Sequence, residues 1–138
     1  MAEVGHGVWI KLDFADGGKC TYERPFLVVN KTGDKLHLIN VSSLKNKERK
    51  LGMNSNKRIV RFRPPFITES FVKLDSVYIV PNNEFIDSKI LCNKRKIHPA
   101  ELKGIREKFN EYRLNNKVKI KEYILKEIEE MNSELSVV

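Results

Sequence analysis

The sequence predicts an α+β fold in which a small, strongly curved antiparallel β-barrel is followed by helices. Apolar and polar residues alternate along residues 7–14, as in a strand with one buried face. Further strand-like runs follow up to residue 81 without a helical stretch between them, so the strands are expected to form one curved sheet or barrel. After Pro99 the spacing of apolar residues changes to that of helices.

The expected strands follow one another closely along the chain. They are residues 7–14, 25–30, 35–41, 58–62 and 70–81. The sequence Thr32-Gly33-Asp34 turns the second strand into the third, which predicts an antiparallel hairpin. Residues 44–57 are polar and basic and contain Gly52, so we expect a long mobile loop there.

Two helical stripes are expected in the last third of the chain. The first begins at Pro99, because proline is favoured at the first helical position. Its apolar face is formed by Leu102, Ile105, Phe109 and Tyr112. The second stripe is formed by Ile120, Ile124, Ile128, Met131 and Leu135. We expect both stripes to pack on the barrel, so that residues 1–138 form one domain, with a barrel at about 5–82 and helices at about 98–135.

An uneven excess of positive charge indicates a polyanionic partner. The chain has 26 Lys and Arg against 18 Asp and Glu, a net charge of +8. Eight of the basic residues lie between positions 45 and 63, against Glu48 alone. Nucleic acid is the first candidate partner, and a solvated lysine-rich face is the alternative. The residues expected to contact the nucleic acid are Lys47, Arg49, Lys50, Lys57, Arg58, Arg61 and Arg63, with Tyr22, Phe62 or Phe66 to stack on a base.

Other classes of protein are disfavoured by the sequence. No apolar run approaches the roughly 20 residues that span a bilayer. Residues 1–9 lack the basic start and apolar core of a secretory signal, which favours a cytoplasmic protein without a membrane partner. Cys20 and Cys92 are widely separated and are expected to be free thiols.

Metal-dependent chemistry is also disfavoured, and no cofactor is expected. Asp13, Asp16 and Glu23 lie near the first loop, but Asp beside Gly-Gly usually serves a turn. The three histidines are His6, His37 and His98. Their positions are scattered and fit no metal-ligand spacing, although a ribonuclease with two catalytic histidines stays open as an alternative.

Polar residues flank the second and third strands in a way that a plain hairpin does not require. Arg24 precedes the second strand, Ser42 and Ser43 end the third, and Lys45 opens the basic segment. Antiparallel pairing brings the start of one strand beside the end of its partner, so we expect these side chains together at one solvent-facing rim. A guanidinium, two hydroxyls and an ammonium are typical of a phosphate site. The alternative is that they are ordinary loop residues.

Three segments carry a resemblance to a known family: GVWIKLDF at 7–14, ERPFLVVN at 23–30 and SFVKLDSVYIVP at 70–81. In this order they resemble the MazF/PemK toxins, small Src-homology-3-like barrels that cut single-stranded RNA in bacterial toxin–antitoxin systems. The resemblance covers about residues 5–82, and Arg24-Pro25 is its most specific element. Within that superfamily, VSSLK at 41–45 is similar to the ToxN branch, the type III toxins. The loop FADGGKCTYERP departs from the Gly-x-Glu-x-x-Gly common in MazF.

The resemblance implies a metal-independent endoribonuclease that acts by attack of the RNA 2′-hydroxyl, leaving a 2′,3′-cyclic phosphate and a 5′-hydroxyl. On the MazF pattern Arg24 and Ser42 are catalytic, and on the ToxN pattern Ser42, Ser43 and Lys45 are. Lys45 is also one candidate for moving the proton. The implied partners are mRNA, an antitoxin that is either an RNA or a small acidic protein, and a second copy in a homodimer or RNA-bridged oligomer. A non-catalytic nucleic-acid-binding barrel, such as a regulator or ribosome-associated module, is the alternative.

Overall fold

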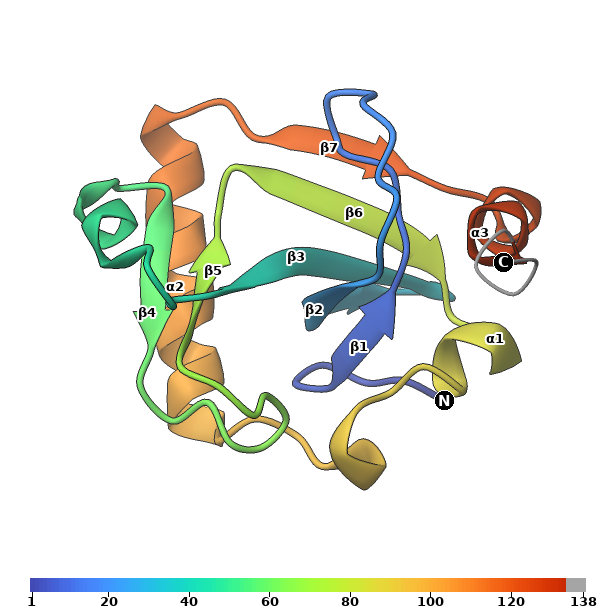
Figure 1. Ribbon diagram of the computed structural model, residues 1–138, viewed down its shortest axis with the longest axis horizontal. Coiled ribbons are helices and arrows are strands. Elements are labelled where there is room, and N and C mark those ends of the chain that lie inside the picture. The colour runs from blue at the N-terminus through green and yellow to red at the C-terminus, as the bar shows by residue number, and fades with distance from the viewer. Residues whose placement is uncertain (134–138) are drawn as a thin grey trace.

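The computed structural model describes residues 1–133 and shows an α+β fold built on a seven-stranded sheet (Figure 1). The strands are β1 (Gly7–Ile10), β2 (Arg24–Thr32), β3 (Lys35–Ser43), β4 (Asn56–Ile59), β5 (Ser70–Lys73), β6 (Ser76–Pro81) and β7 (Lys119–Glu122). The helices are α1 (Glu84–Asp87), α2 (Pro99–Asn115) and α3 (Leu125–Ser133), with 3₁₀ turns η1 (Glu48–Gly52) and η2 (Cys92–Lys94). In this part of the chain every strand pair is antiparallel except β6 with β7. The predicted α+β class is confirmed.

The β2–β3 hairpin that the sequence predicts forms the centre of the sheet. Its strands pair from Thr32 opposite Lys35 to Phe26 opposite Asn40. Gly33 in the turn has a φ of +61°, a left-handed conformation that glycine adopts without a steric penalty.

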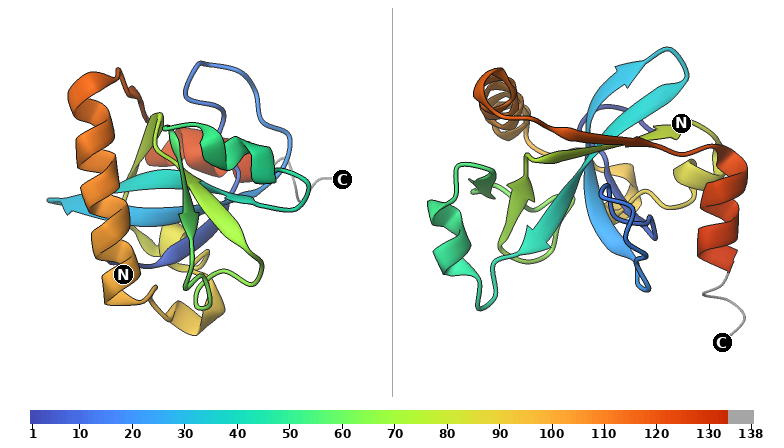
Figure 2. Two further views of the ribbon diagram at one scale, coloured as in Figure 1. Left: turned by 90° about the vertical axis from the view of Figure 1, so that its left-hand side faces the viewer. Right: turned by 90° about the horizontal axis from the view of Figure 1, so that it is seen from above.

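The other edge of β3 pairs with two short strands, which bends the sheet. The first half of β3 pairs with β6 and the second half with β5. Residues 70–81, expected as one strand, are therefore divided at Leu74 and Asp75. Leu74 is fully buried and its N–H donates to Ser55 O at 2.7 Å, so the chain leaves the β3 ladder there. The views in Figure 2 show β5 and β6 diverging on either side of this point.

The sheet does not close into the expected barrel. Its order is β1-β2-β3-β5-β4, with β6 joined to β3 and β7 to β6. The outer edge of β1 is occupied by residues 89–91 instead of by another strand of the sheet. Trp9 N donates to Lys89 O at 3.0 Å, and Leu91 N donates to Gly7 O at 2.8 Å.

Two shorter segments also differ from expectation. The first strand ends at Ile10 and β4 ends at Ile59, earlier than predicted. Residues 44–57 were expected to be a loop throughout, but they contain η1 and the start of β4. Asn56 stabilises η1, because its side-chain amide donates to Lys50 O at 3.0 Å.

The helical part begins as predicted and then departs from prediction. Helix α2 starts at Pro99, and the His98 ring caps it by accepting a hydrogen bond from Ala100 N at 3.0 Å. Ile120 was expected on a helix but lies on β7, where it is 66% exposed. β7 forms there because the free edge of β6 accepts it in parallel register. No helix within residues 1–133 is long and apolar enough to cross a membrane.

The two faces of the sheet carry separate hydrophobic clusters. One contains Phe26, Leu38 and Tyr78, and Ile128 of α3 packs into it. The other contains Leu27 and Ile39 and is completed by the predicted α2 residues Leu102, Ile105, Phe109 and Tyr112. Helices α2 and α3 lie on opposite sides of the molecule, as Figure 1 shows. The predicted Ile128 and Met131 pack as expected, and Leu135 lies outside the described residues.

Helix α3 holds the long connection between β1 and β2. The side chain of buried Asn132 accepts from Lys11 N at 3.0 Å and donates to Lys11 O at 2.9 Å. Just before α3, Tyr123 Oη donates to Asp13 O at 2.6 Å. Residues 11–23, which lead into Arg24, are therefore anchored by the end of the chain.

Candidate functional site

A cavity of about 520 Å³ opens where β2 and β3 separate. The two strands pair as far as Phe26 and Asn40, and beyond that point β3 pairs only with β5. The Asn40 amide spans the start of the gap by donating to Pro25 O at 3.1 Å. The residues lining the cavity include Trp9, Tyr22, Glu23, Arg24, Asn40, Ser42, Ser43, Lys47, Phe66, Ser70 and Lys73.

Strand register places several polar side chains on the same face of the sheet. Phe26 lies opposite Asn40, and Ser42 lies opposite Phe71. Side chains two residues apart on a strand share a face. Arg24 on β2, Ser42 on β3 and Lys73 on β5 therefore all project from one face into this region.

Arg24 lines the cavity but is buried, which corrects the expectation that it faces solvent. Its side chain is only 6% exposed. The guanidinium carbon lies 4.4 Å from the ring centre of Phe14, 5.1 Å from that of Phe26 and 5.4 Å from that of Tyr78. Arg24 Nη2 donates to Leu12 O at 2.9 Å, whereas Nε has no hydrogen-bond partner within the described residues. The charge is thus held rigidly among aromatic rings behind the cavity.

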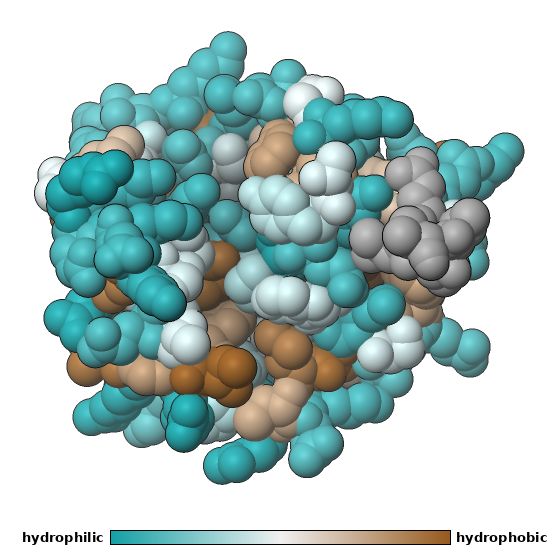
Figure 3. Space-filling model, in the orientation of Figure 1, coloured by the Kyte–Doolittle hydropathy of each residue, from teal (hydrophilic) through white to brown (hydrophobic). Residues whose placement is uncertain are grey.

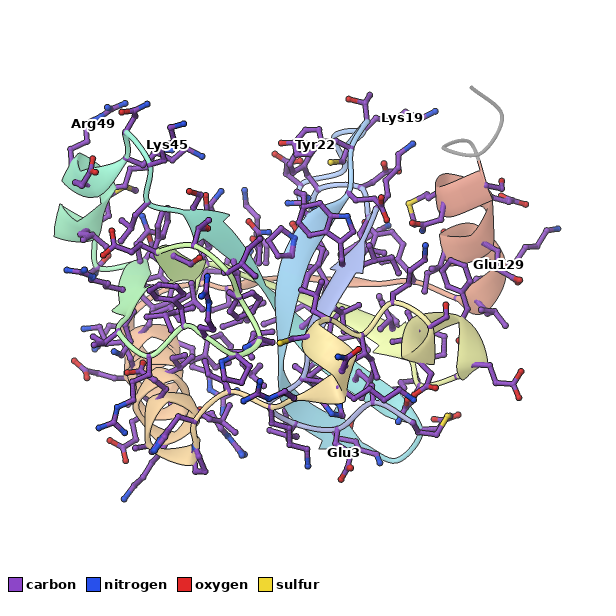
Figure 4. All side chains as sticks on the ribbon, turned by 60° about the horizontal axis from the view of Figure 1, so that its bottom comes forward. Glu3, Lys19, Tyr22, Lys45, Arg49 and Glu129 are labelled. Carbon is purple, nitrogen blue, oxygen red and sulfur yellow. The ribbon has the colours of Figure 1, made fainter. Side chains whose placement is uncertain are left out.

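The two serines line the cavity as predicted. The lysine that lines it with them is Lys47, and not the predicted Lys45. Ser42 Oγ accepts a hydrogen bond from Lys47 Nζ at 3.3 Å. Ser43 Oγ accepts one from the backbone N–H of Lys45 at 3.2 Å, and Lys45 itself is exposed and does not line the cavity. Figure 4 shows Lys45 and Arg49 pointing outward from the segment around η1, across from Tyr22 on the β1–β2 connection.

Lys73 is a cavity residue that the sequence reasoning missed. Burial lowers its pKa below the ordinary lysine value, and the charges of Lys50 and Lys47 lower it further. Asp75 acts in the opposite direction, and Arg24 adds to the lowering. The strand pattern of residues 70–73 contained a signal, because Phe71 and Lys73 share a face and β5 pairs beside the predicted serines.

The other predicted nucleic-acid contacts divide into two groups. Lys47, Arg49 and Lys50 lie on or beside η1; Lys47 lines the cavity, and Lys50 acts on the pKa of the cavity residue Lys73. In the second group, Lys57 lies near α2, because a Cβ at Gly104 would be 3.9 Å from its Cε. The remaining members have their own partners: Arg58 pairs with Glu69 at 3.1 Å, Arg61 contacts the His98 ring at 3.0 Å and Arg63 donates to Ile67 O at 3.0 Å.

The three aromatic residues expected to stack on a base differ in exposure. Tyr22 stands at the cavity rim and is 56% exposed. Phe66 lines the cavity but is buried. Phe62 packs against the cluster beneath α2 and does not line the cavity. Tyr22 is therefore the member of this set that is free to meet a ligand.

The histidines lie outside the cavity and serve local contacts. His6 accepts from Glu3 N at 2.8 Å, and its burial lowers its pKa. His37 contacts Thr32 Oγ1 at 3.0 Å, and burial lowers its pKa as well. In residues 1–133 no group of three His, Cys, Asp or Glu side chains is arranged to hold a metal ion. Asp13 and Asp16 accept backbone hydrogen bonds from Cys20 and Gly18, as expected for turn residues.

No protein-family model matches the chain, and a search of curated proteins finds no match. The chemistry of the cavity is therefore the main basis for a functional conclusion. Arg24, Lys47, Lys50 and Lys73 bring positive charge to it or beside it, and Ser42 and Ser43 contribute hydroxyls. Glu23 is the one carboxylate among the described residues that line it. Such an arrangement favours an anionic ligand with several oxygen atoms.

Proposed function

We propose that the protein is a metal-independent endoribonuclease that cleaves single-stranded RNA. The observation that carries the proposal is the convergence of Arg24, Lys47 and Lys73 with two serines in one cavity. The lowered pKa of Lys73 reflects its burial first and then repulsion by the nearby charges of Lys50 and Lys47, with a smaller part from Arg24. The negative charge of a bound phosphate would relieve the repulsion between these positive side chains. Clusters of this kind are a feature of functional sites more than of stabilising surface networks.

RNA supplies its own nucleophile, so the required protein chemistry is limited. The enzyme must align the 2′-hydroxyl with the adjacent phosphorus, stabilise charge on the phosphate and assist two proton transfers. In the proposal Lys47 and Ser42, which already contact each other at 3.3 Å, hold the non-bridging oxygens. Ser43 offers a second hydroxyl beside them, and buried Arg24 contributes positive potential from behind.

Two cavity residues have the chemistry for the proton transfers. As the bond from the 2′-oxygen to phosphorus forms, Glu23 accepts the hydroxyl proton. As the bond from phosphorus to the 5′-oxygen breaks, the Lys73 ammonium gives a proton to the leaving oxygen. A lysine with a lowered pKa is a better acid than an arginine, whose proton is never released at working pH. We assign this role to Lys73 in place of Lys45, which lies outside the cavity lining.

The proposal includes membership of the MazF/PemK superfamily and a role as a toxin. The strongly curved sheet with Arg24-Pro25 at the start of β2 supports it, although the sheet is open instead of barrel-shaped. Ser42 and Ser43 at the end of β3 favour the ToxN-like branch. The proposed setting is the cytoplasm, with mRNA as substrate and an RNA or a small acidic protein as antitoxin. A homodimer or an RNA-bridged oligomer is part of the same proposal.

We expect cleavage of a single-stranded RNA to survive an excess of chelator, because the nucleophile belongs to the substrate and the charge is supplied by Lys and Arg. The products should carry a 2′,3′-cyclic phosphate and a 5′-hydroxyl, which end-labelling and mass spectrometry distinguish from other ends. Products with a 5′-phosphate, or activity lost on chelation, would contradict the mechanism. RNA binding without any cleavage would favour the non-catalytic binding module.

We expect most of the salt dependence of RNA affinity to come from the basic residues on or beside η1, which are Lys47, Arg49 and Lys50. Replacing Lys47, Arg49 and Lys50 together by Gln should flatten the slope of log affinity against log salt by about 2, because each phosphate contact contributes about 0.7 for single strands. Replacing Lys57, Arg58 and Arg61 removes the same charge and should change the slope much less. Equal slopes for the two triple variants would show that the RNA does not preferentially contact Lys47, Arg49 and Lys50.

A further inference from the structure

The cavity has an apolar wall that the proposed phosphate chemistry does not use. Trp9, the single tryptophan of the chain, belongs to this wall with Pro25, Phe66, Ile67 and Leu91. Its neighbours Val8 and Ile10 are fully buried on the other face of β1, whereas Trp9 is 42% exposed. A large aromatic ring left open to solvent inside a cavity is available for a ligand to cover.

The backbone of Trp9 is held by hydrogen-bonded neighbours on both sides, so the position of its side chain is well defined. Trp9 pairs with Pro25 of β2 on one side, and its N–H donates to Lys89 O at 3.0 Å on the other. Nearby, the absence of a side chain at Gly7 lets the β4–β5 connection approach. A Cβ on Gly7 would lie only 2.8 Å from Pro65 Cγ and 3.2 Å from Phe66 Cε1. That connection therefore forms a second wall beside β1.

The space-filling view supports a ligand with one apolar part. Hydrophobic residues gather in the lower half of the face in Figure 3, beside a hollow and over the region where the β4–β5 connection runs in Figure 1. Hydrophilic residues flank them. The lining of the same cavity also includes Ser42, Lys47 and Lys73. One cavity thus offers a flat aromatic surface and a cationic hydroxyl-bearing surface to the same ligand.

We propose that the cavity binds one nucleotide of the RNA, with its base unstacked from its neighbours and laid against Trp9, and its phosphate toward Lys47 and Lys73. This inference rests on the proposed function and adds the position of the base. The volume of about 520 Å³ lies within the roughly 300–1,000 Å³ of ordinary ligand pockets. Base stacking on an aromatic side chain tolerates every base, so Trp9 contributes affinity more than sequence choice.

Trp9 itself provides the measurement, because it is the only tryptophan that can fluoresce. The probes are four 2′-O-methyl hexanucleotides, one for each base, which lack the nucleophile and are not cleaved. We expect at least one of them to change Trp9 emission in a saturable manner. A hexamer with the same phosphates but abasic sugars should bind through charge without that change.

Affinity measurements on variants complete the test. Trp9→Ala should weaken binding of the hexamers by about 10- to 100-fold, and Trp9→Phe by less, because a phenyl ring still stacks. Ile120→Ala, at an exposed apolar position on β7 outside the cavity lining, is the matched control and should bind as the wild type does. Neither the fluorescence titration nor the control depends on how well the Trp9 variants fold.

The outcomes separate this inference from the proposed function. If wild-type protein cleaves RNA but Trp9 emission does not respond to any base-containing hexamer, the base does not lie on Trp9 and the inference is overturned alone. An equal response to the abasic hexamer overturns it too. If no hexamer binds and no RNA is cleaved, the proposed function is overturned, and with it the inference that rests on it.

Discussion

Replacing Lys73 by Met should reduce RNA cleavage by at least about a hundredfold while making the protein more stable to heat. A positioned general acid typically contributes a factor of about 10²–10⁴ to the rate. The gain in stability has a separate cause, because the ammonium is partly buried near Lys50, Lys47 and Arg24. A side chain that helps catalysis at the expense of stability is a known feature of active sites.

Lys73→Arg provides the control for charge, since it keeps the cation but removes a transferable proton. We expect Arg at this position to preserve RNA binding and to lose cleavage as Met does. The measurements are single-turnover cleavage, RNA affinity and the thermal midpoint of each variant. Normal cleavage by Lys73→Arg would exclude proton donation by Lys73, and a lower midpoint for Lys73→Met would exclude the repulsion that we infer.

The pH dependence of both properties follows from the lowered pKa of Lys73. If its ammonium is the proton donor, cleavage should decline as the pH rises through that pKa, below the ordinary lysine value of 10.5. For stability, the folded protein loses this proton before the unfolded chain does. The unfavourable burial of the charge is therefore complete at pH values below the folded-state pKa and is relieved between that pKa and 10.5. The extra stability of Lys73→Met should shrink over the same interval.

Arg24→Ala is expected to lower the free energy of unfolding by about 2–5 kcal/mol, as a large truncation in a packed interior does. The change removes the contacts with Phe14, Phe26 and Tyr78 and leaves Leu12 O without its bond from Nη2. Chemical denaturation measures this loss. Arg49→Ala, an exposed arginine on η1, is the matched control and should change stability by less than about 0.5 kcal/mol.

Arg24 has a role in stability and a proposed role in cleavage. Measuring cleavage at low temperature, where the variants stay folded, separates the two. Arg24→Lys keeps a positive charge but lacks the planar fork that reaches Leu12 O and stacks on the rings. We expect it to be destabilised and to cleave more slowly per folded molecule. Leu38→Ala, fully buried in the same cluster, should also cost about 2–5 kcal/mol but keep its activity per folded molecule. If Arg24→Ala unfolds at the wild-type midpoint, Arg24 does not hold the aromatic cluster together.

The hairpin was predictable from the sequence because its determinants are local. Thr32-Gly33-Asp34 and the apolar runs on either side lie within a single stretch of chain, and the structure reproduces them as β2 and β3. That the sheet stays open was not predictable in the same way. It depends on residues 89–91, which have no strand pattern but occupy the edge of β1 from 80 or more positions away along the chain. Such pairings leave no local signal.

In the candidate site, too, the features set by local sequence were predictable and those set by distant contacts were not. Ser42 and Ser43 reach the cavity because the hairpin brings the end of β3 beside the start of β2. The burial of Arg24 was missed because the rings around it come from three separate segments. Lys73 was missed because its place depends on the break after β5, where Leu74 turns inward and resets the pairing with β3.

The anchoring of residues 11–23 by Asn132 has a consequence for synthesis of the protein. A ribosome that has made residues 1–91 has already polymerised every described residue that lines the cavity. The connection that carries Tyr22 and Glu23 nevertheless lacks its support until Asn132, 121 positions after Lys11, has emerged and bonded to Lys11. Contacts of such long sequence separation form late in folding. The wall of the cavity formed by Tyr22 and Glu23 is therefore completed only after residue 132 has been made and has folded back onto Lys11.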